Sequence, residues 1–409
     1  MKSKYFYGYH IVAASFVIQA VCIGPLFTYG VFFKQFQAEL GWSRTIISGA
    51  SSLAFFIMGA GGILAGRLND RIGPRIIMVV SGTSLGLGYL LMAHMQAPWQ
   101  LYFLYGIMVG IGFSTHDVIT LSTVARWFVK RRGMMSGIVK VGTGAGQLVV
   151  PLIAAALIAA YGWRHAYTII GATALVILVA AALVLLRDPQ AKGQLPDGNS
   201  TAAGRSMLAA AEHSVSLKKA VRTGPFWILC MAEFTIFFCL LTMIVHIVPH
   251  ATDLGLPPGI AAGVLATIGG VSMLGRISMG TANDKIGGKR SLTICFIILL
   301  GGLFWLQIAS SAWMLFLFAA VYGFSHGGFF TVMSLMVAEL FGTASHGLLF
   351  GLVLFSGTLG GTIGPVLAGR MFDVTGSYQG VFWLLIGLAL SGLVVITLLK
   401  PPESDGSAT

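Results

Sequence analysis

A single arginine in an apolar stretch is the residue with the clearest potential to bind a ligand. Arg276 lies within residues 269–280, a run of small and apolar residues. An ionisable side chain at membrane depth costs about 2.5–3.5 kcal/mol on insertion scales, so such a charge needs a partner inside the protein. A guanidinium stays charged and can hold a carboxylate through two parallel hydrogen bonds. We therefore predict that Arg276 binds a substrate carboxylate; the alternative is a permanent structural ion pair.

Two further charges, Asp117 and Lys140, lie at similar depth in neighbouring apolar stretches. Lys140 lies about six residues from the start of its apolar stretch, which corresponds to about 9 Å at the rise of an α-helix. The sequence leaves two interpretations open. Lys140 either pairs with Asp117 or serves as a second cation for the substrate.

Coupling a process to proton uptake requires a titratable group. The pKa of that group must respond to a neighbouring charge or to a change in the group's own burial. Asp117 is the first candidate, because carboxylates inside membranes mark proton pathways. For each histidine the alternative is an ordinary hydrogen-bonded core residue. The remaining candidates for proton coupling or an intramembrane ion pair are His116, His326, Glu233 and His250.

The composition places these residues in a membrane protein. Of 409 residues, 56% are hydrophobic and 9% are charged, whereas soluble domains have about 25% charged residues. The net charge of +12 could suggest nucleic acid, but the basic residues lie in short loops, which is a membrane-orientation signal. We expect no nucleic acid partner, no metal and no cofactor, since the four cysteines have no metal-ligand spacing. No catalytic residues are predicted and the chain is not expected to be an enzyme, because no Ser/His/Asp set is assignable at matched depth.

Apolar runs of about 20 residues, the length of a membrane span, predict an all-α integral membrane fold of twelve helices. The predicted spans cover residues 9–33, 45–64, 76–93, 101–125, 134–160, 167–186, 226–250, 260–282, 292–308, 314–340, 348–367 and 381–399. These spans form an N-terminal six-helix bundle (1–186), a linker (187–225), a C-terminal six-helix bundle (226–400) and a tail (401–409).

The distribution of lysine and arginine gives the expected orientation. Most of the 25 basic residues fall on the side of the N-terminus, the linker and the tail, and the positive-inside rule assigns that side to the cytoplasm. The first span follows a short polar and aromatic start, so we expect it to remain in place rather than to be cleaved as a signal peptide. The predicted location is the plasma (inner) membrane, with both termini and the linker cytoplasmic.

The two predicted bundles are repeats of each other. Residues 66–75, Gly-Arg-Leu-Asn-Asp-Arg-Ile-Gly-Pro-Arg, recur as residues 280–290, 214 positions later. The same offset relates Gly137 to Gly351, Pro151 to Pro365 and Gly162 to Gly376. Six spans per repeat give both halves the same orientation, and parallel repeats of this kind hold a binding site near the middle of the membrane.

The repeated loop resembles the signature of the major facilitator superfamily. Residues 126–137, followed by 142–146 and Pro151, resemble the span four–five signature of monocarboxylate transporters and of the related oxalate:formate antiporters. Residues 246–249 and the Arg276 helix also look like that family. The resemblance implies that this chain is a bacterial homologue with two pseudo-symmetric bundles. It also implies transport of a small monocarboxylate, such as lactate or pyruvate, with a proton.

The sequence also departs from these relatives. Ser272 stands where animal monocarboxylate transporters have an aspartate, and residues 25–31 lack their lysine, so the resemblance carries over Arg276 but not the lysine/aspartate proton relay. Residues 350–356 are neutral where the oxalate:formate antiporters have a second cation. The sequence therefore favours one carboxylate over two.

Two further groups of residues complete the predicted sites. The substrate pocket is expected to be apolar enough for a methyl or short alkyl group, and its candidates are Ser272, Leu26, Phe27, Tyr29, Tyr322, Phe355 and Ser356. The alternative for its aromatic members is packing.

Charges in the repeated loops can pair across helices and with helix ends, so these loops are expected to act as conformational gates. The alternative is a solvated loop that only sets orientation. The gate candidates are Asp70, Arg71, Arg75, Asp284 and Lys285.

The expected activity is symport of a small monocarboxylate and a proton by alternating access, with the lipid bilayer as the surrounding medium and a monomer as the functional unit. Two alternatives remain. One is an anion exchanger for small mono- or dicarboxylates, and the other is a carboxylate sensor that does not transport.

Overall fold

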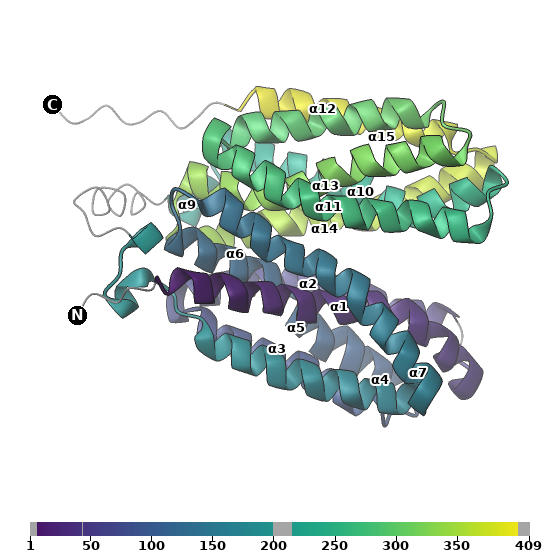
Figure 1. The fold of residues 1–409 in the computed structure, drawn as a ribbon, viewed down its shortest axis with the longest axis horizontal. Helices are drawn as coiled ribbons and strands as arrows, with labels where there is room; N and C mark the ends of the chain where they lie inside the picture. Colours follow the sequence, from purple (N-terminus) through teal and green to yellow (C-terminus); the bar gives the residue numbers. More distant parts are fainter. Residues whose placement is uncertain (1–5, 43, 199–214, 400–409) are drawn as a thin grey trace. The chain divides into compact units, whose positions relative to one another are not determined.

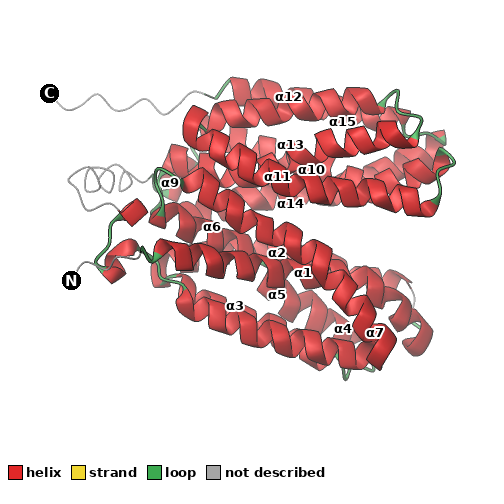
Figure 2. Ribbon diagram, in the orientation of Figure 1, coloured by secondary structure: helices red, strands yellow, loops and turns green. Residues whose placement is uncertain are grey.

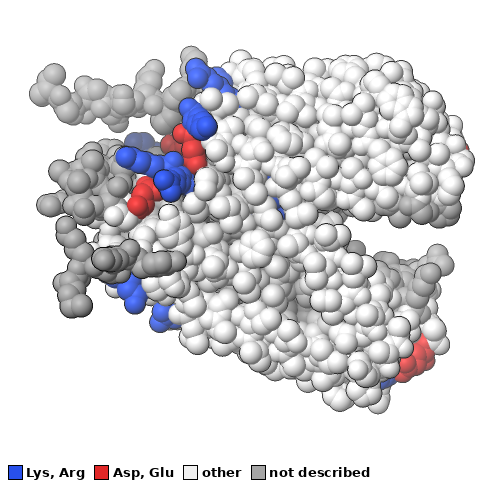
Figure 3. Space-filling view, viewed as in Figure 1, with Lys and Arg blue, Asp and Glu red and all other residues white. Residues whose placement is uncertain are grey.

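The computed structural model describes residues 6–42, 44–198 and 215–399, and across these residues every regular element is a helix (Figures 1 and 2). Eleven helices within the described residues are long and apolar enough to cross a membrane. On the face in Figure 3, Lys and Arg gather at helix ends and are nearly absent from the helix sides. The predicted all-α membrane fold is confirmed.

Contacts divide the chain into two units. Unit 1 comprises Met1–Glu212 together with Thr343–Gly351, and unit 2 comprises His213–Gly342 together with Leu352–Thr409. The predicted boundaries at residues 186, 225 and 400 stay a prediction. Residues 343–351, which include the start of the predicted span 348–367 of the second repeat, make their contacts in unit 1.

Unit 1 contains the helices of the first repeat. They are α1 (Gly8–Leu40), α2 (Arg44–Ile72), α3 (Pro74–Met92), α4 (Pro98–Leu101), η1 (Tyr102–Val109), α5 (Gly110–Phe113), α6 (His116–Trp127) and α7 (Arg132–Val184). The predicted span 101–125 thus consists of four short helices, of which η1 is a π-helix. Because a π-helix changes the residue spacing along the axis, it alters which side chains share a face.

The predicted spans 134–160 and 167–186 both fall within α7. The backbone at Gly162 is not helical (φ 78°, ψ 164°), which is a conformation that side chains other than glycine disfavour. Its repeat partner Gly376 also has positive φ (66°) and separates α14 (His346–Thr375) from α15 (Gln379–Thr397). Gly162 therefore separates two helical segments of the first repeat, as Gly376 separates α14 from α15 in the second.

Unit 2 contains the helices of the second repeat. They are α9 (Leu217–Ala220), α10 (Gly224–Asp253), α11 (Pro258–Ile286), α12 (Gly288–Leu306), α13 (Ala312–Phe341) and most of α14, with α15. The two repeats also share the backbone conformation of the repeated loop. Gly73 and Gly287, 214 positions apart, have φ of 89° and 81° and precede α3 and α12.

Glycines allow two close helix contacts that position the charged residues. A Cβ atom added at Gly327 on α13 would lie 1.9 Å from the backbone oxygen of Ser272 on α11, one turn before Arg276. A Cβ atom added at Gly142 on α7 would lie 2.3 Å from the backbone oxygen of Phe16 on α1, near Lys140. Small residues let helix backbones approach in this way in membrane proteins.

The start of the predicted linker is ordered against unit 1. It forms the turns η2 (Pro189–Lys192) and η3 (Pro196–Gly198). Asp197 Oδ2 accepts hydrogen bonds of 2.9 Å from the backbone N–H groups of Val129 and Lys130. Trp127 Nε1 donates to the backbone oxygen of Leu186. Residues 186–198 are therefore tied to the connection between α6 and α7.

Candidate functional site

A buried polar network in unit 1 centres on Asp117. This residue lies in the first turn of α6, where the helix dipole favours a carboxylate. Its Oδ1 atom accepts a hydrogen bond of 2.7 Å from Lys140 Nζ on α7 and one of 2.8 Å from Gln19 Nε2 on α1. Asp117 is 9% exposed and Lys140 is 2% exposed. Three helices therefore converge on one carboxylate away from solvent.

The network includes two residues that the sequence analysis missed. Gln19 Oε1 accepts a hydrogen bond of 2.7 Å from Thr143 Oγ1, so Gln19 links α7 to Asp117. A glutamine in an apolar span is itself a signal, because polar side chains inside membranes hydrogen-bond between helices. Thr143 carried no such signal, since membrane threonines commonly bond to their own helix.

His116 faces the second oxygen of the same carboxylate. Its Nε2 atom lies 3.5 Å from Asp117 Oδ2, and its Nδ1 atom lies within hydrogen-bond distance of the backbone oxygen of Phe113. A carbonyl only accepts, so this contact assigns the proton of the neutral ring to Nδ1. Nε2 is then the atom that can take up a further proton, next to Asp117.

In unit 2 the structure buries Arg276 among aromatic side chains. Arg276 is 2% exposed, and its Cζ atom lies 5.9 Å from the ring centroid of Phe330 on α13. The Phe330 ring lies 5.0 Å from the His326 ring, which in turn lies 6.5 Å from the Tyr322 ring. A guanidinium over an aromatic face is stabilised by a cation–π interaction. Arg276 and His326 thus share Phe330 as a neighbour.

Helices α10 and α14 approach the same aromatic group. The Phe237 ring on α10 lies 5.2 Å from the Phe330 ring. A Cβ atom added at Gly357 on α14 would meet both Glu233 and Phe237 within 3 Å. Glu233 is buried, and the neighbouring Ser356 hydroxyl donates to the backbone oxygen of Cys230. Within unit 2, α10, α11, α13 and α14 therefore surround a region that contains one buried arginine and one buried glutamate.

Several predicted pocket residues have hydrogen bonds within the protein. The Ser272 hydroxyl donates to the backbone oxygen of Gly269 in its own helix. The hydroxyls of Tyr322 and Tyr29 donate to backbone oxygens of Cys239 and Ile47. Leu26 and Phe355 are half-buried and Phe27 is exposed. Their roles as substrate contacts stay predictions.

His250 lies near the far end of α10 from Glu233. Its ring packs against the rings of Tyr378 and Phe382, at 5.6 Å and 4.9 Å between centroids. The contacts that the structure gives it are aromatic packing contacts at the start of α15. Its assignment to proton coupling stays a prediction.

Comparison with known proteins assigns the fold to a family. The profile described as Major Facilitator Superfamily matches residues 15–282 and 271–409. The chain belongs to the major facilitator superfamily. Monocarboxylate transporter 13 of Rattus norvegicus is 26% identical over 408 residues, covering 96% of this chain and 89% of the relative. Human monocarboxylate transporter 11 is 28% identical, covering 94% and 81%. The predicted resemblance to monocarboxylate transporters is confirmed.

Solved structures agree with this assignment at the level of the fold. The proton:xylose symporter XylE superimposes with a TM-score of 0.75 at 14% identity, covering 96% of this chain and 95% of XylE. The Escherichia coli fucose:proton symporter FucP gives a TM-score of 0.74 at 15% identity, covering 96% and 99%. These relatives are transporters rather than enzymes, and this facilitator is an integral membrane protein that acts on a small molecule.

In this facilitator the first signature loop holds the start of α14. Asp70 at the end of α2 accepts a hydrogen bond of 2.9 Å from Arg126 Nη2. Its two oxygens also accept backbone hydrogen bonds from Gly347 (3.3 Å) and Leu348 (3.0 Å). These two N–H groups lie in the first turn of α14, where backbone N–H groups have no hydrogen-bond acceptor within the helix. Asp70 therefore contacts both a cation on another helix and a helix end, all within unit 1.

The other gate candidates lie at helix ends and differ in exposure. Arg75 Nε donates to the backbone oxygen of Leu185 at 3.3 Å, whereas the side chains of Arg71 and Lys285 are exposed and Asp284 is half-buried.

The second repeated loop, in unit 2, is contacted by Glu339. The oxygens of Glu339 accept hydrogen bonds from Asn283 Nδ2 and from the backbone N–H of Gly288. Unit 1 has Pro74 at the position of Gly288, and proline has no N–H to donate.

Proposed function

We propose that this facilitator carries a small monocarboxylate, such as lactate or pyruvate, together with a proton. The proposed membrane is the plasma (inner) membrane, with both termini in the cytoplasm and the monomer as the functional unit. Arg276 binds the substrate carboxylate, and Asp117 and His116 carry the proton. Two-state rocking of the repeats, as in other facilitators built from parallel repeats, exposes the substrate to each side in turn.

The observation that carries this proposal is the burial of Arg276 beside an aromatic wall. A guanidinium presents a planar fork that matches a carboxylate. The rings of Phe330, Phe237 and Tyr322 supply apolar surface for a methyl or short alkyl group, and polar groups in such pockets fix the orientation of the ligand. The names of the relatives point to the same substrate class.

The state of Lys140 supports one carboxylate rather than two. Its ammonium group lies 2.7 Å from Asp117 Oδ1, so its charge is already balanced within unit 1. A dicarboxylate would need a second cation, and a paired lysine serves this role only after Asp117 is protonated. This arrangement favours monocarboxylate transport over exchange of dicarboxylates.

The same pair suggests how a proton is coupled to transport. When Asp117 takes up a proton, Lys140 loses its buried counter-charge, which is unfavourable unless another anion compensates it. Proton uptake therefore changes the charge balance of unit 1. It is coupled to substrate binding at Arg276 if the proton and the substrate favour the same state of the transporter. His116 Nε2, at 3.5 Å from Asp117 Oδ2, is placed to pass the proton on.

The direct test uses purified protein in proteoliposomes with labelled L-lactate or pyruvate. An inward acid gradient should accelerate uptake in liposomes that contain no internal substrate. Uptake that ignores the gradient would refute proton coupling. Uptake that requires substrate on the opposite side would instead identify an exchanger, and binding without any flux would identify a sensor.

A further inference from the structure

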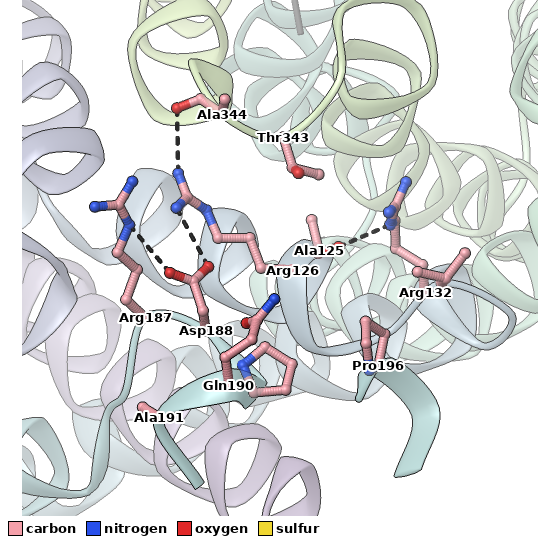
Figure 4. A pocket seen from close by; sticks show the side chains of 12 residues that line it. Ala125, Arg126, Arg132, Arg187, Asp188, Gln190, Ala191, Pro196, Thr343 and Ala344 are labelled. Carbon is pink, nitrogen blue, oxygen red and sulfur yellow. Dashed lines mark hydrogen bonds and ion pairs between the residues drawn. The ribbon is translucent and has the colours of Figure 1, made fainter. Parts of the chain in front are cut away.

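A cavity of about 390 Å³ lies in unit 1, outside the sites discussed above. Figure 4 shows its walls, which come from the end of α6, the start of α7, the segment around η2 and the residues before α14. Three of its lining residues are arginines, namely Arg126, Arg132 and Arg187, and one is an acid, Asp188. The lining therefore has two more positive than negative charges.

Arg126 contributes a buried guanidinium to this cavity. Its side chain is 7% exposed. Nη2 contacts Asp70 at 2.9 Å and the backbone oxygen of Ala344 at 3.3 Å, whereas Nη1 reaches Asp188 only at 3.5 Å. Its Nε atom is buried and has no hydrogen-bond partner within the described part of the chain. A buried donor of this kind is unfavourable while it stays unsatisfied.

Asp188 is shared between two guanidiniums at long distance. Its Oδ1 lies 3.5 Å from Arg126 Nη1, and its Oδ2 lies 3.4 Å from Arg187 Nε. Charge-assisted N–H···O hydrogen bonds are about 2.7–2.9 Å long, so one carboxylate satisfies neither arginine fully. A group with more oxygens and more charge would match the pair better.

We propose that this cavity binds a phosphate monoester through Arg126 and Arg187. A phosphate monoester carries about −1.5 to −2 charge at neutral pH and offers three acceptor oxygens, and the three lining arginines outnumber the acids Asp188 and Asp70 that contact them. Guanidiniums recognise phosphate through paired hydrogen bonds. A volume of about 390 Å³ leaves room for an organic group beyond the phosphate.

The site is separate from the proposed carboxylate site, because Arg276 lies in unit 2 and the cavity lies in unit 1. It nevertheless shares Arg126 with the contact that Asp70 makes to the start of α14. A bound phosphate would draw Arg126 away from Asp188 and change the charge around Asp70. Occupancy is therefore expected to act on the stability of that contact.

The test measures binding of AMP to the purified full chain in a neutral detergent by isothermal titration calorimetry, with adenosine as the probe that lacks phosphate. Binding of AMP but not adenosine is expected. Arg187→Gln should weaken AMP binding by about tenfold or more, since it removes a charge-assisted contact. Arg222→Gln, the same change at an exposed arginine outside the cavity, should leave binding unchanged.

Asp188→Asn provides a test in the opposite direction. Removing the competing carboxylate should strengthen AMP binding by several-fold, which a merely misfolded variant would not do. Equal affinity of wild type and Arg187→Gln, weaker binding by Asp188→Asn, or equal binding of adenosine would each overturn the proposal.

A phosphate monoester also occurs as the headgroup of phosphatidic acid, so a second arm identifies the source. The chain is reconstituted into nanodiscs of phosphatidylcholine with or without phosphatidic acid, and its thermal unfolding is compared. Stabilisation by AMP in phosphatidylcholine alone indicates a soluble ligand. Stabilisation only by phosphatidic acid, lost in Arg187→Gln, assigns the site to a lipid headgroup. Stabilisation by neither probe would refute the site.

Discussion

Lys140 and Asp117 form a buried ion pair between α7 and α6, with 2.7 Å between Nζ and Oδ1. Gln19 donates to the same oxygen and His116 faces the other one, so the carboxylate has partners on both sides. Buried pairs of this kind are costly to break, because the remaining charge is left without compensation. Loss of either charge should therefore be costly for the folded protein.

Removal of both partners of this pair should destabilise the protein less than the two single removals added together. We expect Lys140→Met or Asp117→Asn alone to cost about 3–5 kcal/mol, as for other broken buried pairs. The double variant should cost clearly less than the sum of the two single variants, since it leaves no isolated charge. Unfolding of the purified proteins in detergent provides the measurement. Strict additivity would show that the two charges do not interact.

The close contact of α11 and α13 should tolerate no side chain at Gly327. A methyl group there would lie 1.9 Å from the backbone oxygen of Ser272, so Gly327→Ala forces the two helices apart beside Arg276. We expect a loss of at least about 2 kcal/mol, in the range of overpacked cores, together with impaired transport. Gly270→Ala is the matched control on α11, because nothing lies within 4 Å of its added Cβ atom. Equal stability of the two variants would contradict this close packing.

Asp70 should contribute more than the other charges of its loop. Asp70→Asn removes the ion pair with Arg126 and weakens acceptance from the N–H groups of Gly347 and Leu348. The expected cost is about 1–3 kcal/mol, measured as thermal unfolding, with an altered transport rate. Arg71→Gln should change neither, because the Arg71 side chain is exposed. A larger effect at Arg71 than at Asp70 would refute the assignment.

Glu39, beyond the apolar part of α1, should make stability depend on pH. Hydrogen bonds from Trp163 Nε1 and from Arg164, with the charge of Arg164, lower the pKa of Glu39 below its usual 4.5 despite opposing desolvation. A lowered pKa in the folded state means that the stabilisation is fully present above about pH 4.5 and is lost as the pH falls through the lowered value.

The measurement for Glu39 is the difference in unfolding temperature between wild type and Glu39→Gln. This difference should be constant from pH 7 to about pH 5 and should shrink as the pH falls further. A difference that grows on acidification would show that the pKa is shifted in the other direction.

The sequence was sufficient for those features that depend on composition, spacing and repetition. Apolar length predicted the helices, and the 214-residue offset predicted a relation that reappears in the positive φ of Gly73 and Gly287. Matching depth brought Asp117 and Lys140 together as one of two interpretations, and the structure contains that contact. Which of these residues act in transport still requires experiment.

Other features depend on backbone geometry and long-range packing that local patterns do not encode. The π-helix η1 replaces part of a uniform span with a register that apolar length cannot reveal. The contact between Asp70 and Leu348 joins residues 278 positions apart. Gln19 contacts Asp117 on α6 and Thr143 on α7, and its polarity within an apolar span indicates a contact between helices but not which helices.

The most direct test of the central claim is proton-driven uptake of labelled lactate or pyruvate by Arg276 variants in proteoliposomes. Arg276→Ala should lower uptake by at least about tenfold through loss of the charge-assisted contact, and Arg276→Lys should restore part of it because it keeps the charge without the planar fork. Arg370→Ala, at an exposed position on α14, is the control and should transport normally. Unchanged uptake by a folded Arg276→Ala variant would contradict the account.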